Sequence, residues 1–454
     1  MHATNAEQRH QMLTEPIGRL LFKKSLPTVI IQLITVIYNT ADTYFVAQIG
    51  TSASAAVGVV FSLMAIIQAI GFGIGMGANS LISPSLGAKR EQDANVYGST
   101  AVVMGLVMGA LISVLGLVFL HPLMRLIGAS ETVLPYAADY AKYILLAAPF
   151  MCLSFVLNNI LRAEGQALYS MIGLTTGGIL NLILDPIFIF LLRRGIAGAA
   201  LATMAGQLVG FTILLSIFLR DRSIVKLRVR FVSRRPGVYW RILRTGAPTF
   251  LRQGLSSLAS TLLNVQAMVF GDAAVAAISI ANKLYMLVRN VVIGIGHGFQ
   301  PIAGYCYGAK RYSRVKAVFW RATIAATVIC AGIALCIFFF REPIMVWFRD
   351  DPEVVRIGST MLAFMCVSIP MLGYSTFVNQ LYQSLGFAFG ASFLASCRQG
   401  LFFLPLVFLL PVLFGVHGIE SVQAAADVLT FLISIPFHIW FFRKHLNLPD
   451  AQED

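Results

Sequence analysis

The sequence predicts an all-α integral membrane protein whose twelve transmembrane helices form two parallel-related six-helix bundles. Three observations carry this prediction: an apolar composition, apolar runs long enough to cross a membrane, and an internal duplication. Of the 454 residues, 57% are hydrophobic and only 12% are charged, whereas an ordinary soluble domain has about 25% charged residues.

Apolar runs of roughly 20 residues recur along the whole chain, and that is the length a helix needs to cross a hydrocarbon core of about 30 Å. We expect these runs to be helical because lipid offers no hydrogen-bond partners to the edges of an open sheet. The expected spans are 27–49, 55–80, 96–119, 136–158, 168–192, 197–219, 243–269, 274–302, 317–340, 357–380, 389–413 and 418–441.

The chain repeats itself with an offset of 221 residues. A Gly-x-Gly-x-Gly stretch begins at Gly73 and again at Gly294, and after nine intervening residues each is followed by Gly-Ala-Lys-Arg. The same offset pairs Pro27 with Pro248, Gln32 with Gln253, Pro149 with Pro370, Asn158 with Asn379 and Gly165 with Gly386. A constant offset over this range indicates an internal duplication. In an apolar chain the duplication favours a transporter, since alternating-access carriers are commonly built from two repeats. Glycines four residues apart also allow helices to approach closely.

Six spans return the chain to the side of the membrane where it began, so the two repeats share one orientation. The expected organisation is a cytoplasmic N-terminal segment (1–26), a first bundle (27–219), a basic cytoplasmic linker (220–242), a second bundle (243–441) and a cytoplasmic tail (442–454). Residues 16–24 are expected to form a short amphipathic helix on the inner surface. No cleavable signal is expected at the N-terminus.

The formal net charge of +14 raises the question of a nucleic-acid partner. Lys and Arg gather instead in the turns on one side of the membrane and in the linker, which is the positive-inside pattern and puts both termini in the cytoplasm. No GxxxxGK[ST] motif occurs, so neither nucleotide coupling nor a cofactor is expected. An intramembrane enzyme would need converging catalytic groups that the few intramembrane histidines do not supply. We therefore expect no enzyme.

Two acidic residues inside the predicted first bundle indicate the mechanism. Asp42 lies deep in the first span and Asp185 in the fifth. A carboxylate at membrane depth is costly unless it is paired, protonated or bound to a cation. Asn181 and Asp185 are four residues apart and share a helical face, and Pro186 should disturb the helix and free a carbonyl. The alternative for Asp185 is that it only ends the helix or pairs with a structural partner.

Several motifs in this order resemble the multidrug and toxic compound extrusion (MATE) family, in particular its bacterial DinF/MepA-like branch. They are the Asp42 segment running into Phe45-Val46-Ala47-Gln48-Ile49-Gly50, the Asn181-x-x-x-Asp185-Pro186 element, Gly195-x-x-Gly198-Ala199-Ala200-x-Ala202-Thr203, and the two Gly-Ala-Lys-Arg turns. The resemblance covers nearly the whole chain. It implies the 6+6 fold and a secondary active antiporter of the bacterial inner membrane that acts as a monomer. Such an antiporter exports amphipathic, mostly cationic drugs in exchange for H⁺ or Na⁺.

Carried over residue by residue, the resemblance implies a cation-coupling site made by Asp42, Asn181, Asp185 and Thr203, where Na⁺ is the alternative to a proton. No other metal is expected. The acidic ligands of the NorM-like branch lie in the second bundle, where this chain has Gln253 on the seventh span and no Asp or Glu between Gly358 and Arg398. The expected cavity residues are Tyr38, Asn39, Asn158, Gln253, Lys283, Arg289, Asn379 and Arg398.

The second bundle differs from the first in charge. Its spans hold Arg252, Lys283, Arg289 and Arg398, with Asp427 on the twelfth. Buried cations need partners or water. Three readings stay open: a structural network such as Arg398 with Asp427, a share of the substrate cavity that favours zwitterionic or partly anionic compounds, and snorkelling to an interface. The basic residues also keep one alternative function open, a lipid-linked oligosaccharide flippase of the same wider superfamily.

Overall fold

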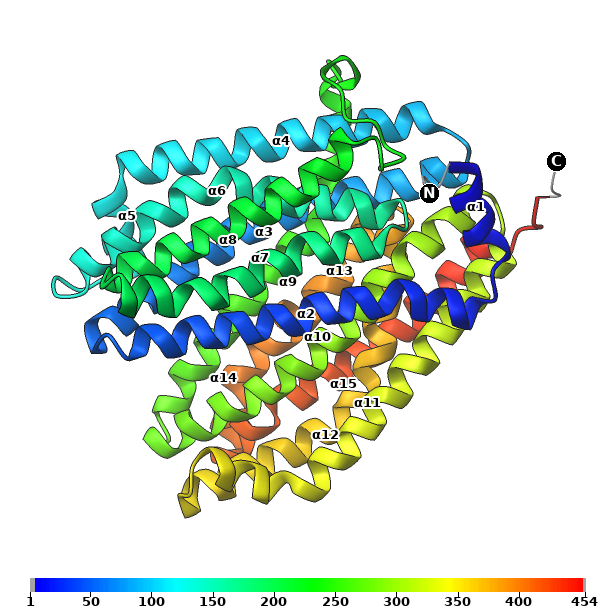
Figure 1. The fold of residues 1–454 in the computed structure, drawn as a ribbon. Coiled ribbons are helices and arrows are strands. Elements are labelled where there is room, and N and C mark those ends of the chain that lie inside the picture. Colours follow the sequence, from blue (N-terminus) through cyan, green and yellow to red (C-terminus); the bar gives the residue numbers. More distant parts are fainter. Residues whose placement is uncertain (1–4, 452–454) are drawn as a thin grey trace. The chain divides into compact units, whose positions relative to one another are not determined.

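The computed structural model describes residues 5–451, and all regular elements in that range are helical (Figure 1). The helices are α1 (Asn5–Thr14), α2 (Ile17–Ala47), α3 (Thr51–Gly87), α4 (Glu91–Val118), α5 (Leu120–Ile127), α6 (Leu134–Ala163), α7 (Ala167–Pro186), α8 (Gly195–Leu219), α9 (Pro236–Met268), α10 (Asp272–Gly308), α11 (Tyr312–Phe348), α12 (Pro352–Ser384), α13 (Ala388–Ser396), α14 (Phe403–Phe414) and α15 (Val416–Phe441). π-Helical segments cover Ile187–Leu191, Cys397–Phe402 and Phe442–Leu446, and a 3₁₀ turn covers Val229–Phe231.

Eleven of the twelve predicted spans are confirmed by their length and hydropathy. Within residues 5–451, eleven helical segments are long and apolar enough to cross a membrane, and one of them joins α13 and α14 through their π-helical segment. The twelfth is α9, which has 33 residues. It is less apolar than the others because its centre carries Arg252, Gln253 and Ser256.

The start of the chain differs from the expectation. Residues 17–24, expected as a separate surface helix, form the first turns of the long helix α2. The helix runs on because nothing in this segment breaks it before Pro27, and α2 continues through Pro27 as well. A separate helix lies earlier, at α1, where Arg9 donates to the carbonyl of Gly87 at 2.9 Å.

Two compact units make up the chain, and they do not coincide with the two repeats. The first contains residues 30–246 and the N-terminal residues up to Met12; the second contains residues 13–29 and the chain from Ala247 onward. The first turns of α2 therefore belong to the unit built from the second repeat. The first turns of α9 belong in the same way to the unit built from the first repeat.

The glycine-rich stretches explain why the first turns of α2 and of α9 each pack in the unit built from the other repeat. In the second unit, a Cβ on Gly294 would stand 2.7 Å from Cα of Val29, and one on Gly298 would collide with Ser25. The repeat-related contact in the first unit joins Gly77 to Ile242. Real Cβ atoms do not approach this closely, so glycine is required where each stretch receives the first helix of the other repeat. A hydrogen bond also stabilises this contact: the hydroxyl of Thr28 donates to the carbonyl of Gly294 at 2.6 Å.

The two Gly-Ala-Lys-Arg turns share an unusual backbone. Lys89 has φ 60° and its counterpart Lys310 has φ 56°, in the left-handed region that side chains other than Asn or Asp rarely adopt. Both turns close with the same hydrogen bond, from Arg90 N to Ser85 O and from Arg311 N to Cys306 O, each 2.8 Å. The duplication thus preserves turn geometry as well as sequence.

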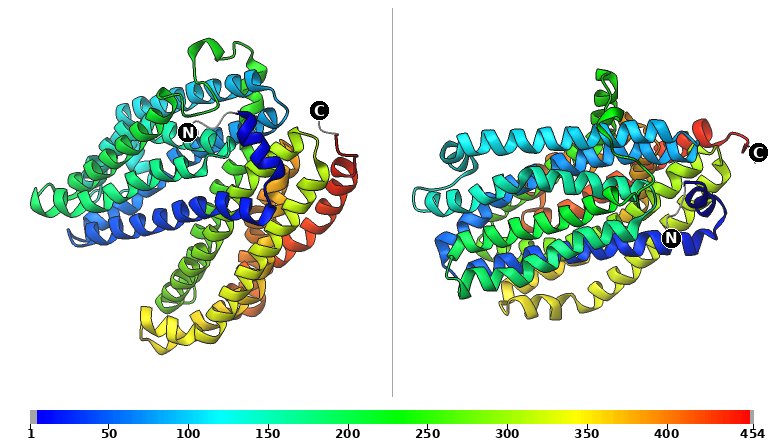
Figure 2. Two further views of the ribbon diagram at one scale, coloured as in Figure 1. Left: turned by 45° about the vertical axis from the view of Figure 1, so that its right-hand side comes forward. Right: turned by 45° about the horizontal axis from the view of Figure 1, so that its top comes forward.

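The linker between α8 and α9 docks on the first unit. Glu164, directly after α6, accepts hydrogen bonds from the Ser223 hydroxyl, from Ile224 N at 2.9 Å and from Val225 N at 3.0 Å. Further along, Lys226 N donates to the side chain of Asn95 on α4 at 2.7 Å. Figure 2 shows this green segment alongside the end of α4. The basic linker is therefore held in place by polar contacts to α4 and to the end of α6.

Candidate functional site

Helices α7 and α8 approach each other closely through glycines. A Cβ on Gly177 would lie 2.6 Å from the carbonyl oxygen of Gly206, and a Cβ on Gly206 would lie 2.6 Å from that of Gly177. One turn away, a Cβ on Gly210 would lie 3.0 Å from Gly173 O. This backbone contact is the close packing that small residues permit in membranes, and it sets the spacing of the polar side chains on either side.

Next to this contact, Asn181 joins the two helices. Its side-chain nitrogen lies 3.3 Å from Oδ1 of Asp185, one turn along α7, and 3.2 Å from Oγ1 of Thr203 on α8. All three side chains are buried, and Asp185 is 0% exposed. The structure therefore brings three of the four predicted cation-coupling residues together.

The fourth, Asp42 on α2, reaches the same site through a residue that the sequence did not single out. The hydroxyl of Tyr140, on α6, lies 3.2 Å from Oδ2 of Asp42. Tyr140 is fully buried and also interacts with Thr203 and with the charge of Asp185. The negative charge of Asp42 also acts on the carboxyl group of Asp185. Four helices thus contribute to one buried acidic site.

Three oxygens in this site lack a hydrogen-bond partner among residues 5–451. They are Oδ1 of Asp42, Oδ1 of Asn181 and Oδ2 of Asp185, and all three atoms are buried. A buried oxygen without a partner is costly, and two carboxylates near each other repel when both are ionised. Shared protonation or a bound cation would relieve both costs. Carboxylate and amide oxygens are ligands for hard cations such as Na⁺, so the donor set fits either ion.

Pro186 has the predicted effect on α7. The α-helix ends there and continues as the π-helical segment Ile187–Leu191. Pro186 has no N–H, so it leaves the carbonyl of Leu182 without its usual donor in the turn that carries Asp185. π-Helical turns are often found at functional sites.

The predicted cavity residues of the first unit lie in different surroundings. The ring of Tyr38 packs on Gly178 of α7, one turn from Asn181, and Tyr38 interacts electrostatically with Asp42. Asn39 is half-buried on the same part of α2. Both residues therefore lie beside the acidic site, and their role in substrate binding stays a prediction.

Asn158 and Asn379 make equivalent contacts in the two repeats. Asn158 donates to the carbonyl of Ser170 at 3.0 Å, and Asn379 donates to the carbonyl of Ala391 at 2.6 Å. Ser170 and Ala391 are themselves related by the 221-residue offset, and both asparagines are buried. These hydrogen bonds link α6 to α7 and α12 to α13. Both side chains therefore have a structural role, and their predicted role in lining the substrate cavity stays a prediction.

In the second unit, the predicted pair forms: Nε of Arg398 lies 2.7 Å from Oδ1 of Asp427. Arg289 donates to the Ser256 hydroxyl at 3.0 Å. Gln253 is half-buried on α9, and Lys283 is exposed on α10. The predicted cavity residues of this half therefore do not form one group: Arg289 and Arg398 are half-buried and hydrogen-bonded, Asn379 bridges α12 and α13, and Lys283 is exposed.

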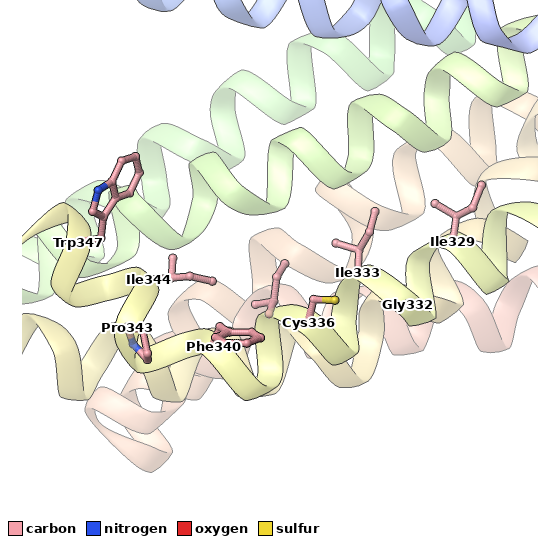
Figure 3. Close-up of a pocket in the computed structure, with 9 residues that line it drawn as sticks. Ile329, Gly332, Ile333, Cys336, Phe340, Pro343, Ile344 and Trp347 are labelled. Carbon is pink, nitrogen blue, oxygen red and sulfur yellow. The ribbon is translucent and has the colours of Figure 1, made fainter.

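A separate apolar hollow lies along α11 (Figure 3). Its lining comes from successive turns of that one helix: Ile329, Gly332, Ile333, Cys336, Ile337, Phe340, Pro343, Ile344 and Trp347. None of these side chains carries a full charge. The hollow therefore offers apolar surface and no charged group.

The family model for MatE matches residues 27–187 and 248–409, once in each repeat. Among curated proteins, the chain is similar to the multidrug export protein MepA of Staphylococcus haemolyticus (strain JCSC1435), with 28% identity over 98% of both chains. The MepA of Staphylococcus aureus (strain MSSA476) is 27% identical over the same shares.

Solved structures give the same fold. A multidrug resistance MATE family transporter of the MOP superfamily, in an outward-facing conformation, superposes with a TM-score of 0.90 at 24% identity, covering 95% of this chain and 98% of the other. A MOP superfamily transporter from Pyrococcus furiosus Vc1 (DSM3638), described as having a binding pocket of reverse polarity, superposes with a TM-score of 0.87 at 25% identity over 95% and 96%.

Proposed function

The chain belongs to the MATE family of multidrug efflux transporters, and on that premise we propose that it is a secondary active antiporter for amphipathic, mostly cationic organic compounds. Its driving ion is H⁺ or Na⁺. The protein works in the bacterial inner membrane as a monomer, with both termini in the cytoplasm. It needs no cofactor, and its partners are its drug substrates and the lipid bilayer.

The single observation that supports ion coupling most strongly is the set of buried oxygens on Asp42, Asn181 and Asp185 that have no hydrogen-bond partner among residues 5–451. A site with two close carboxylates and free oxygens has a strong reason to take up a positive charge. The same site accepts a proton, which either carboxylate can hold, or a Na⁺ ion, for which Thr203 would supply a fourth oxygen.

The proposed cycle uses this uptake to move α2. When the transporter faces outward, the cation enters and compensates the charges of Asp42 and Asp185. The contacts of α2 with Tyr140 and with α7 then change, which weakens drug binding so that the drug leaves to the outside. Release of the cation to the cytoplasm restores the ionised pair. An ion can drive this change only through its different affinity for the two states.

A lipid-linked oligosaccharide flippase is the alternative function, and the basic residues of the second unit favour it. The acidic site of the first unit favours the antiporter, because lipid flipping gives no reason to keep two carboxylates buried together. Loss of transport on replacing either carboxylate would separate the two functions.

Drug resistance conferred on an efflux-deficient bacterium tests the proposal. We expect Asp42→Asn and Asp185→Asn to abolish resistance, because neither amide can exchange a proton or carry the charge that holds a cation. Asp139→Asn is the matched control, since Asp139 is an exposed carboxylate on α6 next to Tyr140. Equal membrane levels of all three variants must be verified. Full resistance in Asp42→Asn would rule out the mechanism.

A further inference from the structure

We propose that Arg252, Arg289 and Arg398 form an anion site in the second unit that takes a carboxylate or phosphate group of an amphipathic ligand. This inference rests on the proposed transport function for the ligand's amphipathic character. The site itself is argued from the residues of the second unit alone.

Hydrogen bonds link the helices that carry the three arginines. Arg289 donates to Ser256, which lies one turn from Arg252 on α9, and Arg398 donates to the hydroxyl of Tyr285, which lies one turn from Arg289 on α10. The carboxylate of Asp427 lies beside them and pairs with Arg398. Three positive charges and one negative charge therefore share a region at membrane depth, where unbalanced charge is expensive.

The carboxylate of Asp427 already accepts four hydrogen bonds, and its single negative charge cannot balance three positive charges. Its Oδ1 accepts from Arg398 at 2.7 Å and from Gln423 at 3.2 Å, and its Oδ2 accepts from Tyr285 at 2.5 Å and from Ser368 at 3.4 Å. Four donors on two oxygens are close to the capacity of a carboxylate. Asp427 therefore neutralises and orients Arg398.

Arg252 and Arg289 form no ion pair of their own with residues 5–451. Within the part of the chain that the structure describes, the buried ion pair of this unit is that between Arg398 and Asp427. Arg289 donates a hydrogen bond to the neutral Ser256 hydroxyl, and both arginines are half-buried. Two guanidinium forks in a partly water-excluded setting match the bidentate geometry of a carboxylate or phosphate.

Two of the helices around the cluster have features that are unfavourable in a membrane helix. Helix α9 carries Arg252 and Ser256, and its polar residues make it the least apolar of the twelve spans. Arg398 sits in the π-helical segment Cys397–Phe402, which interrupts the helix between α13 and α14. Both features cost stability in a membrane helix, and recognition of a polar group gives a reason to retain them.

Direct binding to the purified full-length protein tests the site. The probes are a rhodamine dye with a free carboxylate and the methyl ester of the same dye, which keeps the cation and removes the anion. Fluorescence polarisation in detergent gives Kd for both dyes. We expect Arg252→Gln and Arg289→Gln each to weaken binding of the carboxylate dye about tenfold or more, which is the usual effect of losing a charged hydrogen bond. Binding of the ester should not change.

Two controls keep the result interpretable. Arg349→Gln removes an exposed positive charge after α11 and should leave both Kd values unchanged. Arg252→Lys keeps the charge but loses the fork, so it should recover part of the affinity for the carboxylate dye. Unchanged ester binding in the Gln variants shows that they are folded. Equal affinity of the wild type for both dyes, or full carboxylate binding in both Gln variants, would overturn the proposal.

The anionic group can come from a transported compound or from a lipid head group. Nanodiscs of phosphatidylglycerol and of phosphatidylcholine distinguish them: competition with the carboxylate dye by phosphatidylglycerol alone assigns the site to lipid, and its absence assigns the site to transported compounds. Ester export with no Arg-dependent binding of the carboxylate dye would refute this inference alone. Arg-dependent binding without export of either dye would refute the proposed function and leave the anion site intact.

Discussion

The hydroxyl of Tyr140 lies 3.2 Å from Oδ2 of Asp42 and ties α6 to α2 at the acidic site. Asp42 belongs to the helix that is shared between the two units, whereas Tyr140 lies in the core of the first unit. The hydrogen bond therefore links the carboxylate of Asp42 directly to the core of the first unit. Any change in the charge of Asp42 must change this contact.

Tyr140→Phe should weaken coupling without unfolding the protein. The ring stays packed, but Asp42 loses a donor to a buried oxygen, a loss of about 1–3 kcal/mol. We expect the concentration of driving ion that gives half-maximal dye efflux to shift by at least about tenfold. The measurement is efflux from vesicles as a function of pH and of Na⁺. An unchanged ion dependence would show that Tyr140 only fills space.

Gly206→Ala should separate α7 from α8. The new methyl group would stand 2.6 Å from the carbonyl oxygen of Gly177, and overpacking of this kind costs about 1–3 kcal/mol. It would also move Thr203 away from Asn181, so export should fall together with thermal stability. Gly58→Ala on α3 is the control, because a Cβ there would meet no atom of residues 5–451 within 4 Å. Equal behaviour of the two variants would contradict the glycine contact.

Asn158→Ala and Asn379→Ala should destabilise the protein by similar amounts. Each removes a buried hydrogen bond to a backbone carbonyl that the repeats share, which costs about 1–3 kcal/mol. Thermal unfolding in detergent measures the loss. If the two residues act only in this way, the relative export of different drugs should not change. A change in drug preference in either variant would support the predicted cavity role.

Glu164 should make the attachment of the linker depend on pH. Burial raises the pKa of its carboxyl group from 4.5 to about 7, although its hydrogen bonds with Ser223, Ile224 and Val225 oppose that shift. Because the folded-state pKa lies above the unfolded value, its contribution is fully present below pH 4.5 and is lost as pH rises to about 7. Wild type should therefore lose stability over this window, by up to about 3 kcal/mol.

Glu164→Gln should remove that pH dependence, since an amide does not titrate. The variant should also lose one acceptor for the linker backbone and be less stable than wild type at low pH. Thermal melts of both proteins at several pH values between 4.5 and 7.5 make the comparison. Parallel pH profiles for wild type and variant would show that Glu164 does not titrate in this range.

The spans and the acidic residues were predictable because each has a local physical signature. A membrane helix requires a long apolar run, and a carboxylate inside such a run is costly enough to mark a site. Tyr140 has no such signature. A tyrosine is common in membrane helices, and its hydroxyl draws attention only when the fold places it against Asp42.

The sequence also did not predict that the first turns of α2 and of α9 each pack in the unit of the other repeat. The glycine-rich stretches predicted a close helix contact, but a glycine does not identify its partner. The partners of the second stretch are Ser25 and Val29, which lie in the first turns of α2. Asn158 shows the same limit, because an asparagine in a membrane helix can line a cavity or bridge two helices.

Transport in reconstituted vesicles under separate H⁺ and Na⁺ gradients tests the central claim most directly, that the buried site of Asp42 and Asp185 carries the driving ion. The account predicts that one of the two gradients drives efflux of a cationic dye by the wild type. It predicts that Asp185→Asn, still able to bind the dye, no longer responds to that gradient. Gradient-driven efflux by Asp185→Asn equal to that of the wild type would contradict it.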